Sequence, residues 1–349
     1  MNSRERVLAA ARREKVDRVP VAPWGVGKLS VESPAWKELL EKTDPIIGAG
    51  GCNPFLGKLA KARTETEGDV TTTVIETPKG DLVRRRQKTD ITSATIEFPL
   101  KGPDDVEKLL SIPYEPPDIN ADAFHQRREE IGDQGLVTAG FGGNPVCIPA
   151  SWFSPEEFCI QWIENPDLLV RLVSVAAERQ RYAAEDLCKA GVDAFRMVGG
   201  EYVSVQLGPN AVKPLLKDFD TEIIEIIHRH GGLVFYHNHG PLMRYLADYA
   251  DMGFDVLDPL EAVPWGDADL AKAKEIIGGR FTILGNLDDM EVLGKYSEEE
   301  VKDIARTNLE AYGIEGHIIG GTTSGTYTEH AARNFIALVD VAEEFGGNL

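Results

Sequence analysis

The chain has 349 residues, of which 42% are hydrophobic and 27% are charged, so it can bury a large core. Asp and Glu outnumber Lys and Arg by 57 to 37, and the resulting net charge of −20 argues against nucleic-acid binding and against docking on anionic lipid. The four cysteines are widely spaced and no apolar run approaches the ~20 residues that cross a bilayer, so we expect a soluble, cytoplasmic protein with reduced thiols.

The N-terminal hundred residues predict one helix and a few strands. A helix capped by Ser3 opens the chain, and residues 17–24 form a short apolar run whose prolines limit it to the start or end of a strand. Residues 25–65 are punctuated by glycine and proline, which predicts an irregular segment. Residues 66–100 predict a β-hairpin with one further strand, which is too small to form a convincing independent domain.

From Gly135 onward, short apolar segments alternate with helical patterns, which is typical of repeated βα units around a parallel sheet. Six such units, with the N-terminal strand as a seventh, approach the eight that close a barrel. No long linker or change of composition divides the chain. We therefore predict an α/β fold in which residues 1–349 form a single (β/α)8 TIM barrel with residues 66–100 as a β-hairpin insertion. The strand candidates in these units are 136–140, 193–198, 233–236, 256–257, 281–284 and 317–319.

Polar segments that contain glycine or proline follow most of these predicted strands. In a parallel barrel the carboxyl ends of all strands lie on one rim, and that rim holds the active site. Polar capping of strand ends accounts for any one of these segments, but it accounts less well for their recurrence after five strands. We therefore place a candidate active site at this rim. The polar residues that would meet there include Glu201, His237, His239, Glu261 and Asn286.

The sharpest cluster is His237-Asn238-His239. Residues i and i+2 of an extended segment face the same side, so both imidazoles can point into the barrel mouth. Neutral imidazole is a common zinc ligand, and catalytic zinc sites use three protein ligands with one open position. Glu201 or Asp218 can supply a further ligand. The alternative is that the two histidines are hydrogen-bonded rim residues that only order the loop.

Several motifs, taken in order and spacing, resemble the uroporphyrinogen decarboxylase superfamily over nearly the full length. The resemblance is closer to the corrinoid-dependent methyltransferase branch than to the decarboxylases, and it implies a (β/α)8 barrel. Decarboxylases carry Arg-Gln-Ala-Gly-Arg after the first strand to bind acidic side chains of the substrate, whereas residues 24–28 here read Trp-Gly-Val-Gly-Lys. The motifs are residues 3–10 with 17–21, 190–193, 253–261 and 285–288.

The metal-binding motifs of the thiol-methylating members are altered in this chain. Those members carry His-x-Cys-Gly and a second cysteine near the last strand as zinc ligands. Here the first motif reads His237-x-His239-Gly240, and residues 322–324 read Thr-Thr-Ser. Nitrogen and oxygen ligands leave zinc a stronger Lewis acid than thiolates do. The departure therefore resembles the ether-cleaving O-demethylase methyltransferases.

The ether-cleaving pattern implies a zinc ion held by Glu201, Asp218 and His239, with His237 as a fourth ligand or a supporting group. Asp220 can replace Asp218, because the sequence does not fix the phase of that helix. The zinc would stabilise the oxygen that leaves as the C–O bond breaks.

The sequence thus predicts a methyltransferase that moves a methyl group from a small methoxylated compound to the cob(I)alamin of a corrinoid partner protein. We expect the methoxylated compound to be aromatic. The alternatives are methyl transfer from a methylated corrinoid to a thiol or folate, a lyase like uroporphyrinogen decarboxylase, and a non-catalytic binding barrel. Glu201 and His239 are the predicted catalytic residues. The predicted substrate-binding residues are Trp24, Phe141, Glu261, Asn286 and Tyr327.

Overall fold

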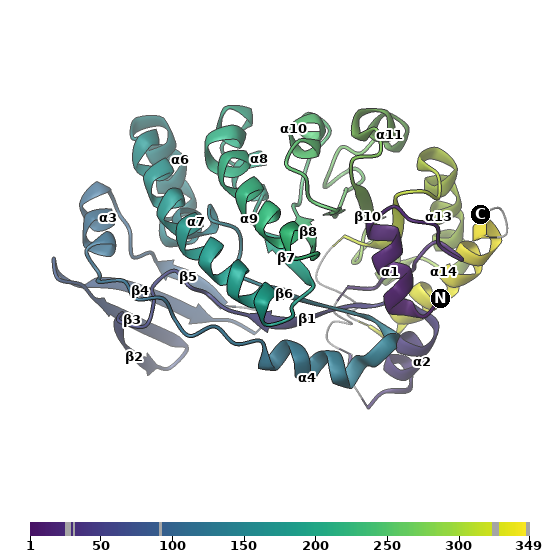
Figure 1. Ribbon diagram of the computed structural model, residues 1–349, viewed down its shortest axis with the longest axis horizontal. Helices are drawn as coiled ribbons and strands as arrows, with labels where there is room; N and C mark the ends of the chain where they lie inside the picture. The colour runs from purple at the N-terminus through teal and green to yellow at the C-terminus, as the bar shows by residue number, and fades with distance from the viewer. Residues whose placement is uncertain (25–28, 31, 91–92, 323–327, 347–349) are drawn as a thin grey trace.

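The fold is built on a curled parallel sheet of seven strands that follow one another in chain order. The computed structural model describes residues 1–24, 29–30, 32–90, 93–322 and 328–346 (Figure 1). Six of the strands lie where the sequence predicts them, which confirms the α/β fold with a parallel sheet. The strands are β1 (Ile46–Gly51), β6 (Leu136–Gly140), β7 (Ala194–Val198), β8 (Leu233–His237), β9 (Val256–Asp258), β10 (Thr282–Leu287) and β11 (His317–Gly321).

The extended segment 20–24 lies between the two edge strands of this sheet. The amide of Ala22 donates to the carbonyl of Ile319 in β11 (2.8 Å), and the amide of Ile46 in β1 donates to the carbonyl of Pro23 (3.1 Å). The two contacts join β11 to β1 through the segment. Pro20 and Pro23 have no N–H to donate, so the segment forms isolated bridges in place of a full strand. Where the predicted (β/α)8 barrel would have eight strands, the described residues form seven parallel strands and one extended segment.

Residues 25–65 were expected to be irregular, and this prediction is wrong for one helix, for β1 and for the start of the strand Lys61–Glu67. Helix α2 (Pro34–Lys42) begins after Ser33, whose hydroxyl accepts from the amide of Trp36, and it has proline in its first turn. Strand β1 follows, but only its two isoleucines are buried before a glycine-rich end. Such a strand carries almost no alternation, which explains why the sequence pattern missed it.

A separate four-stranded antiparallel sheet lies between β1 and the first long helices. Its central pair is the predicted hairpin, and the sheet forms the end of the molecule opposite the two chain termini in Figure 1. The first strand begins before the predicted range 66–100. The sequence pattern missed its start because its residues Lys-Ala-Arg-Thr-Glu-Thr-Glu are all exposed and give no apolar signal. The strands are β2 (Lys61–Glu67), β3 (Val70–Glu76), β4 (Leu82–Lys88) and β5 (Ser93–Glu97).

The amino ends of the parallel strands are covered by the first helix. Val7, Leu8 and Ala11 of α1 pack in one cluster with Leu136 and Leu233, which begin β6 and β8. The cap of α1 is Asn2, one residue before the predicted Ser3.

The helices are α1 (Ser3–Ala11), α2, α3 (Pro103–Leu110), α4 (Asp122–Ile131), α5 (Cys147–Trp152), α6 (Pro155–Glu164), α7 (Pro166–Lys189), α8 (Glu201–Ser204), α9 (Asp218–Arg229), α10 (Leu246–Ala250), α11 (Leu270–Ile277), α12 (Val292–Lys295), α13 (Glu298–Tyr312) and α14 (Glu329–Gly346), with a π-helical turn at Lys213–Lys217.

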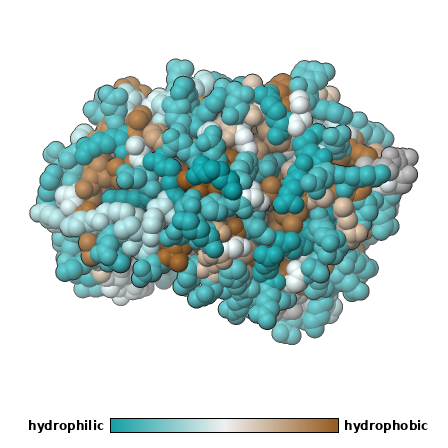
Figure 2. Space-filling view, viewed as in Figure 1, coloured by the Kyte–Doolittle hydropathy of each residue, from teal (hydrophilic) through white to brown (hydrophobic). Residues whose placement is uncertain are grey.

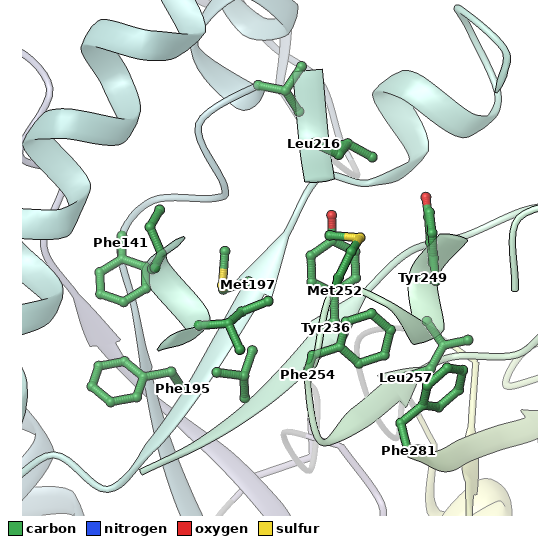
Figure 3. Close-up of a cluster of buried hydrophobic side chains, with 14 of the residues drawn as sticks. Phe141, Phe195, Met197, Leu216, Tyr236, Tyr249, Met252, Phe254, Leu257 and Phe281 are labelled. Carbon is green, nitrogen blue, oxygen red and sulfur yellow. The ribbon is translucent and has the colours of Figure 1, made fainter. Parts of the chain in front are cut away.

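The main core includes aromatic side chains that pack in pairs (Figure 3). Phe141 stacks on Phe195 with 5.4 Å between ring centroids, and Tyr236 stacks on Phe254 at 4.8 Å. The face seen in Figure 2 is mainly hydrophilic, with small separate hydrophobic patches. Within the described residues, no helix has the length and apolar character needed to span a membrane.

Candidate functional site

A cavity of about 460 Å³ opens at the carboxyl ends of the parallel strands. This volume lies in the range of small-molecule sites. The segments that follow β7, β8, β9 and β10 all contribute to it, so residues of the predicted rim line one cavity. The lining residues described by the structure are Glu201, Val205, Gln206, His239, Gly240, Glu261, Trp265, Asp288, Met290 and Glu291.

Glu201 enters the cavity from the first turn of α8, directly after β7. A β-carbon on the preceding Gly200 would lie 2.0 Å from the Asn238 side-chain oxygen, so only glycine lets this turn approach β8 so closely. The Oε2 atom of Glu201 is buried and has no hydrogen-bond partner among the described residues. The site therefore holds a carboxylate oxygen whose hydrogen-bonding capacity the described residues leave unused.

The His-Asn-His segment at the end of β8 splits its side chains between two environments. Asn238 is fully buried and accepts from the Tyr249 hydroxyl (2.7 Å), which anchors the segment to α10. The rings of His237 and His239 lie edge to face with 4.5 Å between centroids. Of these two rings, His239 lines the cavity and His237 is buried. The two imidazoles are neighbours, as predicted, but only one of them contributes to the cavity wall.

His239 is held by Glu261, which follows β9. Its Nδ1 lies 3.0 Å from Oε1 of Glu261, and the other carboxylate oxygen accepts from the amide of Gly240 (2.6 Å). Burial alone would lower the pKa of His239, but the hydrogen bond and charge of Glu261 outweigh burial and raise it above 6.5. The ring can therefore hold a proton near neutral pH.

A partly buried charged group, the guanidinium of Arg196, lies beside His237. Arg196 of β7 donates to Nδ1 of His237 (2.7 Å) and to Oδ2 of Asp258 (3.1 Å), and its guanidinium lies 4.0 Å from the ring centroid of Trp24. Burial lowers the pKa of His237 despite the neighbouring Asp258. Arg196 was not predicted as a site residue, although an arginine in the middle of the apolar strand Ala-Phe-Arg-Met-Val was a visible signal.

The structure does not bring all four predicted zinc ligands together. Asp218 forms an ion pair with Lys213, is 45% exposed and does not line the cavity. Asp220 is buried and accepts from the hydroxyl of Tyr236 (2.7 Å), and burial raises its pKa to about 7. Within the described residues, no three His, Cys, Asp or Glu side chains are grouped closely enough to hold a metal ion.

Only two of the predicted ligands, Glu201 and His239, line the cavity, whereas catalytic zinc sites use three protein ligands. The residues described here therefore do not fit the predicted zinc site. Of the two alternatives for the acid, neither Asp218 nor Asp220 reaches the cavity wall.

The predicted substrate-binding residues lie in different parts of the structure. Glu261 lines the cavity, and Asn286 lines a smaller adjoining cavity of about 230 Å³ that shares Glu261 and Trp265 with the first. Phe141 is fully buried against Phe195, which places it in the core. Trp24 is 6% exposed, packs on Phe235 and Arg196, and does not line the cavity. Tyr327 lies outside the described residues.

Sequence reasoning missed the apolar wall of the cavity. Trp265 and Met290 line it and are 62% and 56% exposed. Both come from loops that follow β9 and β10, several residues beyond the strand ends. Large hydrophobic residues in otherwise polar loops were the available signal.

The comparisons with known proteins agree on one family. The chain is 24% identical over 318 residues to the methylcobamide:CoM methyltransferase MtaA of Methanosarcina barkeri, covering 87% of this chain and 88% of that protein. It is 26% identical over 203 residues to a uroporphyrinogen decarboxylase of Gloeobacter violaceus, covering 55% and 54%.

A solved structure, a methyltransferase from Methanosarcina mazei, has the same fold with a TM-score of 0.66 at 19% identity, covering 99% of both chains. The sequence pattern of the uroporphyrinogen decarboxylase (URO-D) family matches residues 87–345, which include all the described residues that line the cavity. The chain therefore belongs to the uroporphyrinogen decarboxylase family.

Proposed function

We propose that this chain is a methyltransferase that moves a methyl group from a small methoxylated compound to the corrinoid of a partner protein. One observation carries the proposal: in a chain similar to a methylcobamide methyltransferase over 87% of its length, a cavity at the strand ends joins Glu201 to the His239–Glu261 pair. The cavity also has an apolar wall, as a methoxyarene requires.

The chemical difficulty in this reaction is the leaving oxygen. When the C–O bond of a methyl ether breaks, the electron pair stays on oxygen, which needs a proton or a positive charge. The partner's reduced corrinoid supplies the nucleophile that takes the methyl group. In this chain His239 holds the proton, and its Nε2 is the ring nitrogen left for the substrate because Nδ1 bonds to Glu261. Proton transfer from Nε2 to the leaving oxygen gives the neutral alcohol or phenol.

Exposed apolar residues around the cavity suit the approach of a partner protein. Val205, Val263, Trp265 and Met290 are each more than half exposed. The corrinoid must come within bonding distance of the methyl carbon, so its protein must cover this opening. An exposed apolar rim favours such a contact.

The experiment follows methyl transfer directly. The purified protein is incubated with a reduced corrinoid protein and methoxyarenes labelled in the methyl group, and label on the corrinoid protein is measured over time. We expect His239→Gln to lower kcat by about 100-fold or more, because glutamine cannot transfer a proton. The exposed histidine variant His125→Gln is the matched control and should keep full activity. Unchanged transfer by His239→Gln would refute the role given to His239.

A second candidate is methyl transfer from a methylated corrinoid to a thiol, which the name of the Methanosarcina barkeri relative favours. Rapid methylation of small thiols with no turnover of methoxyarenes would establish this candidate in place of the first. Decarboxylation of a substrate with many carboxylates is disfavoured, because the described lining of the cavity contains four acidic side chains and no Lys or Arg.

A further inference from the structure

The cavity carries an excess of negative charge. Four of its described lining residues are acidic, namely Glu201, Glu261, Asp288 and Glu291, and none of the described ones is Lys or Arg. His239 is the single titratable base among them. The sign of the field in the cavity therefore depends on how far nearby groups neutralise these four carboxylates.

The two acidic residues of the loop after β10 are only weakly neutralised. Glu291 pairs with Lys295 at 2.7 Å, but both side chains are more than half exposed, so solvent screens the pair. Oδ1 of Asp288 accepts from the backbone amides of Met290 (2.9 Å) and Glu291 (2.6 Å). These amides stabilise a carboxylate in its charged form without cancelling its charge.

The two inner acidic residues have less solvent around them. Glu261 is 5% exposed and is held by His239 and by one backbone amide. Glu201 places a buried oxygen in the site with no hydrogen-bond partner among the described residues. A single histidine thus faces two carboxylates at the inner end of the cavity, and a bound cation would supply the missing counter-charge.

Arg196 does not reverse this balance. Its guanidinium is bound by Asp258, which is 1% exposed, and stacks on Trp24. The charge of Arg196 is therefore neutralised inside the barrel, and Arg196 is not one of the cavity-lining residues.

We propose that the cavity binds a methyl donor that carries a positive charge beside an apolar methoxylated body, in preference to a carboxylate of the same size. Its role as a methyl donor rests on the proposed function, whereas the charge preference is a property of binding alone. Trp265 offers an aromatic face to the arene or to the ammonium group. Met290 and Val205 supply the remaining apolar contact.

Binding is measured by calorimetry with the full chain and no corrinoid protein, using three ligands of similar size. They are 2-(4-methoxyphenyl)ethylammonium, the neutral 2-(4-methoxyphenyl)ethanol and 4-methoxyphenylacetate. We expect the ammonium compound to bind at least about tenfold more tightly than the carboxylate at low salt. The ratio should fall as salt rises, because ions screen the field. Equal or tighter binding of the carboxylate, or no binding of any of the three, would overturn the proposal.

A variant connects the preference to the cavity. Glu201→Gln keeps the size of the side chain and removes one charge, so we expect the ammonium-to-carboxylate ratio to fall several-fold. Glu299→Gln removes a charge on α13 outside the cavity, and its ratio should match that of the parent. An unchanged ratio in Glu201→Gln, with the thermal unfolding temperature of the parent retained, would refute the assignment. Absence of methyl transfer together with a clear charge preference would refute the proposed function and leave this inference standing.

Discussion

Acidification should destabilise the protein through one buried histidine. His317, the first residue of β11, is 2% exposed, and its Nδ1 has no hydrogen-bond partner among the described residues. Burial lowers the pKa of His317 from 6.5 to about 4, although a hydrogen bond to the backbone of Gly313 acts in the opposite direction. The folded protein therefore keeps this ring neutral at a pH where the unfolded chain protonates it.

The direction and size of the effect follow from proton linkage. Well above pH 6.5 His317 is neutral in both states and has no effect on the pH dependence of folding. As the pH falls from 6.5 toward 4, the unfolded state binds a proton that the folded state cannot, so stability is lost. One pKa unit corresponds to about 1.4 kcal/mol, which gives a loss of about 2 kcal/mol between pH 7 and pH 5.

The assay compares the free energy of unfolding in urea at pH 7 and pH 5 for the parent and for His317→Gln. The variant should be less stable at pH 7, because it disturbs a packed site next to Tyr312, but it should lose about 2 kcal/mol less than the parent on acidification. His125→Gln, at an exposed histidine, should lose as much as the parent. Equal losses in the parent and His317→Gln would refute the reasoning.

Three further predictions concern the site. Arg196→Met leaves Asp258 buried without its cation, so we expect a loss of roughly 3–5 kcal/mol in the free energy of unfolding. The double variant with Asp258→Asn should recover most of this loss. No loss of stability in Arg196→Met would contradict a stabilising role for the ion pair. Asp218→Asn should leave kcat/KM for methyl transfer unchanged, since Asp218 pairs with Lys213 away from the cavity. A large fall in kcat/KM would show that Asp218 acts in the site after all. Trp265→Ala should raise the KM for a methoxyarene several-fold with no change in unfolding temperature, because the side chain lines the cavity and is 62% exposed.

The repeating part of the fold was predictable because its signals are local. Each strand from β6 to β11 is a short buried apolar run, and helices such as α13 carry a capping box at Ser297 and Glu300. Strand β1 was not predictable, since its glycine-rich end gives no pattern. The segment 20–24 takes its place through hydrogen bonds to residues far along the chain, which no local pattern contains.

The candidate site was predictable in location but not in detail. The rule that strand ends share one rim placed Glu201, His239 and Glu261 correctly in a common cavity. The phase of the segment before α9 was not fixed by the sequence, and the structure turns Asp218 to the surface. The ion pair of Arg196 with the buried Asp258 also depends on side-chain packing across three strands, which sequence spacing does not specify.

The contacts of segment 20–24 with β1 and β11 impose an order on folding during synthesis. The partner of the segment in β11, Ile319, is synthesised about three hundred residues after the segment itself. Until then the segment lacks its β11 neighbour on one side, and its unpaired backbone groups are open to wrong pairings. A protein that loses its first two dozen residues would keep two such edges permanently and lose the helix that covers the barrel floor. Aggregation of a nascent or truncated chain is thus a direct consequence of joining β1 to β11 through the segment 20–24.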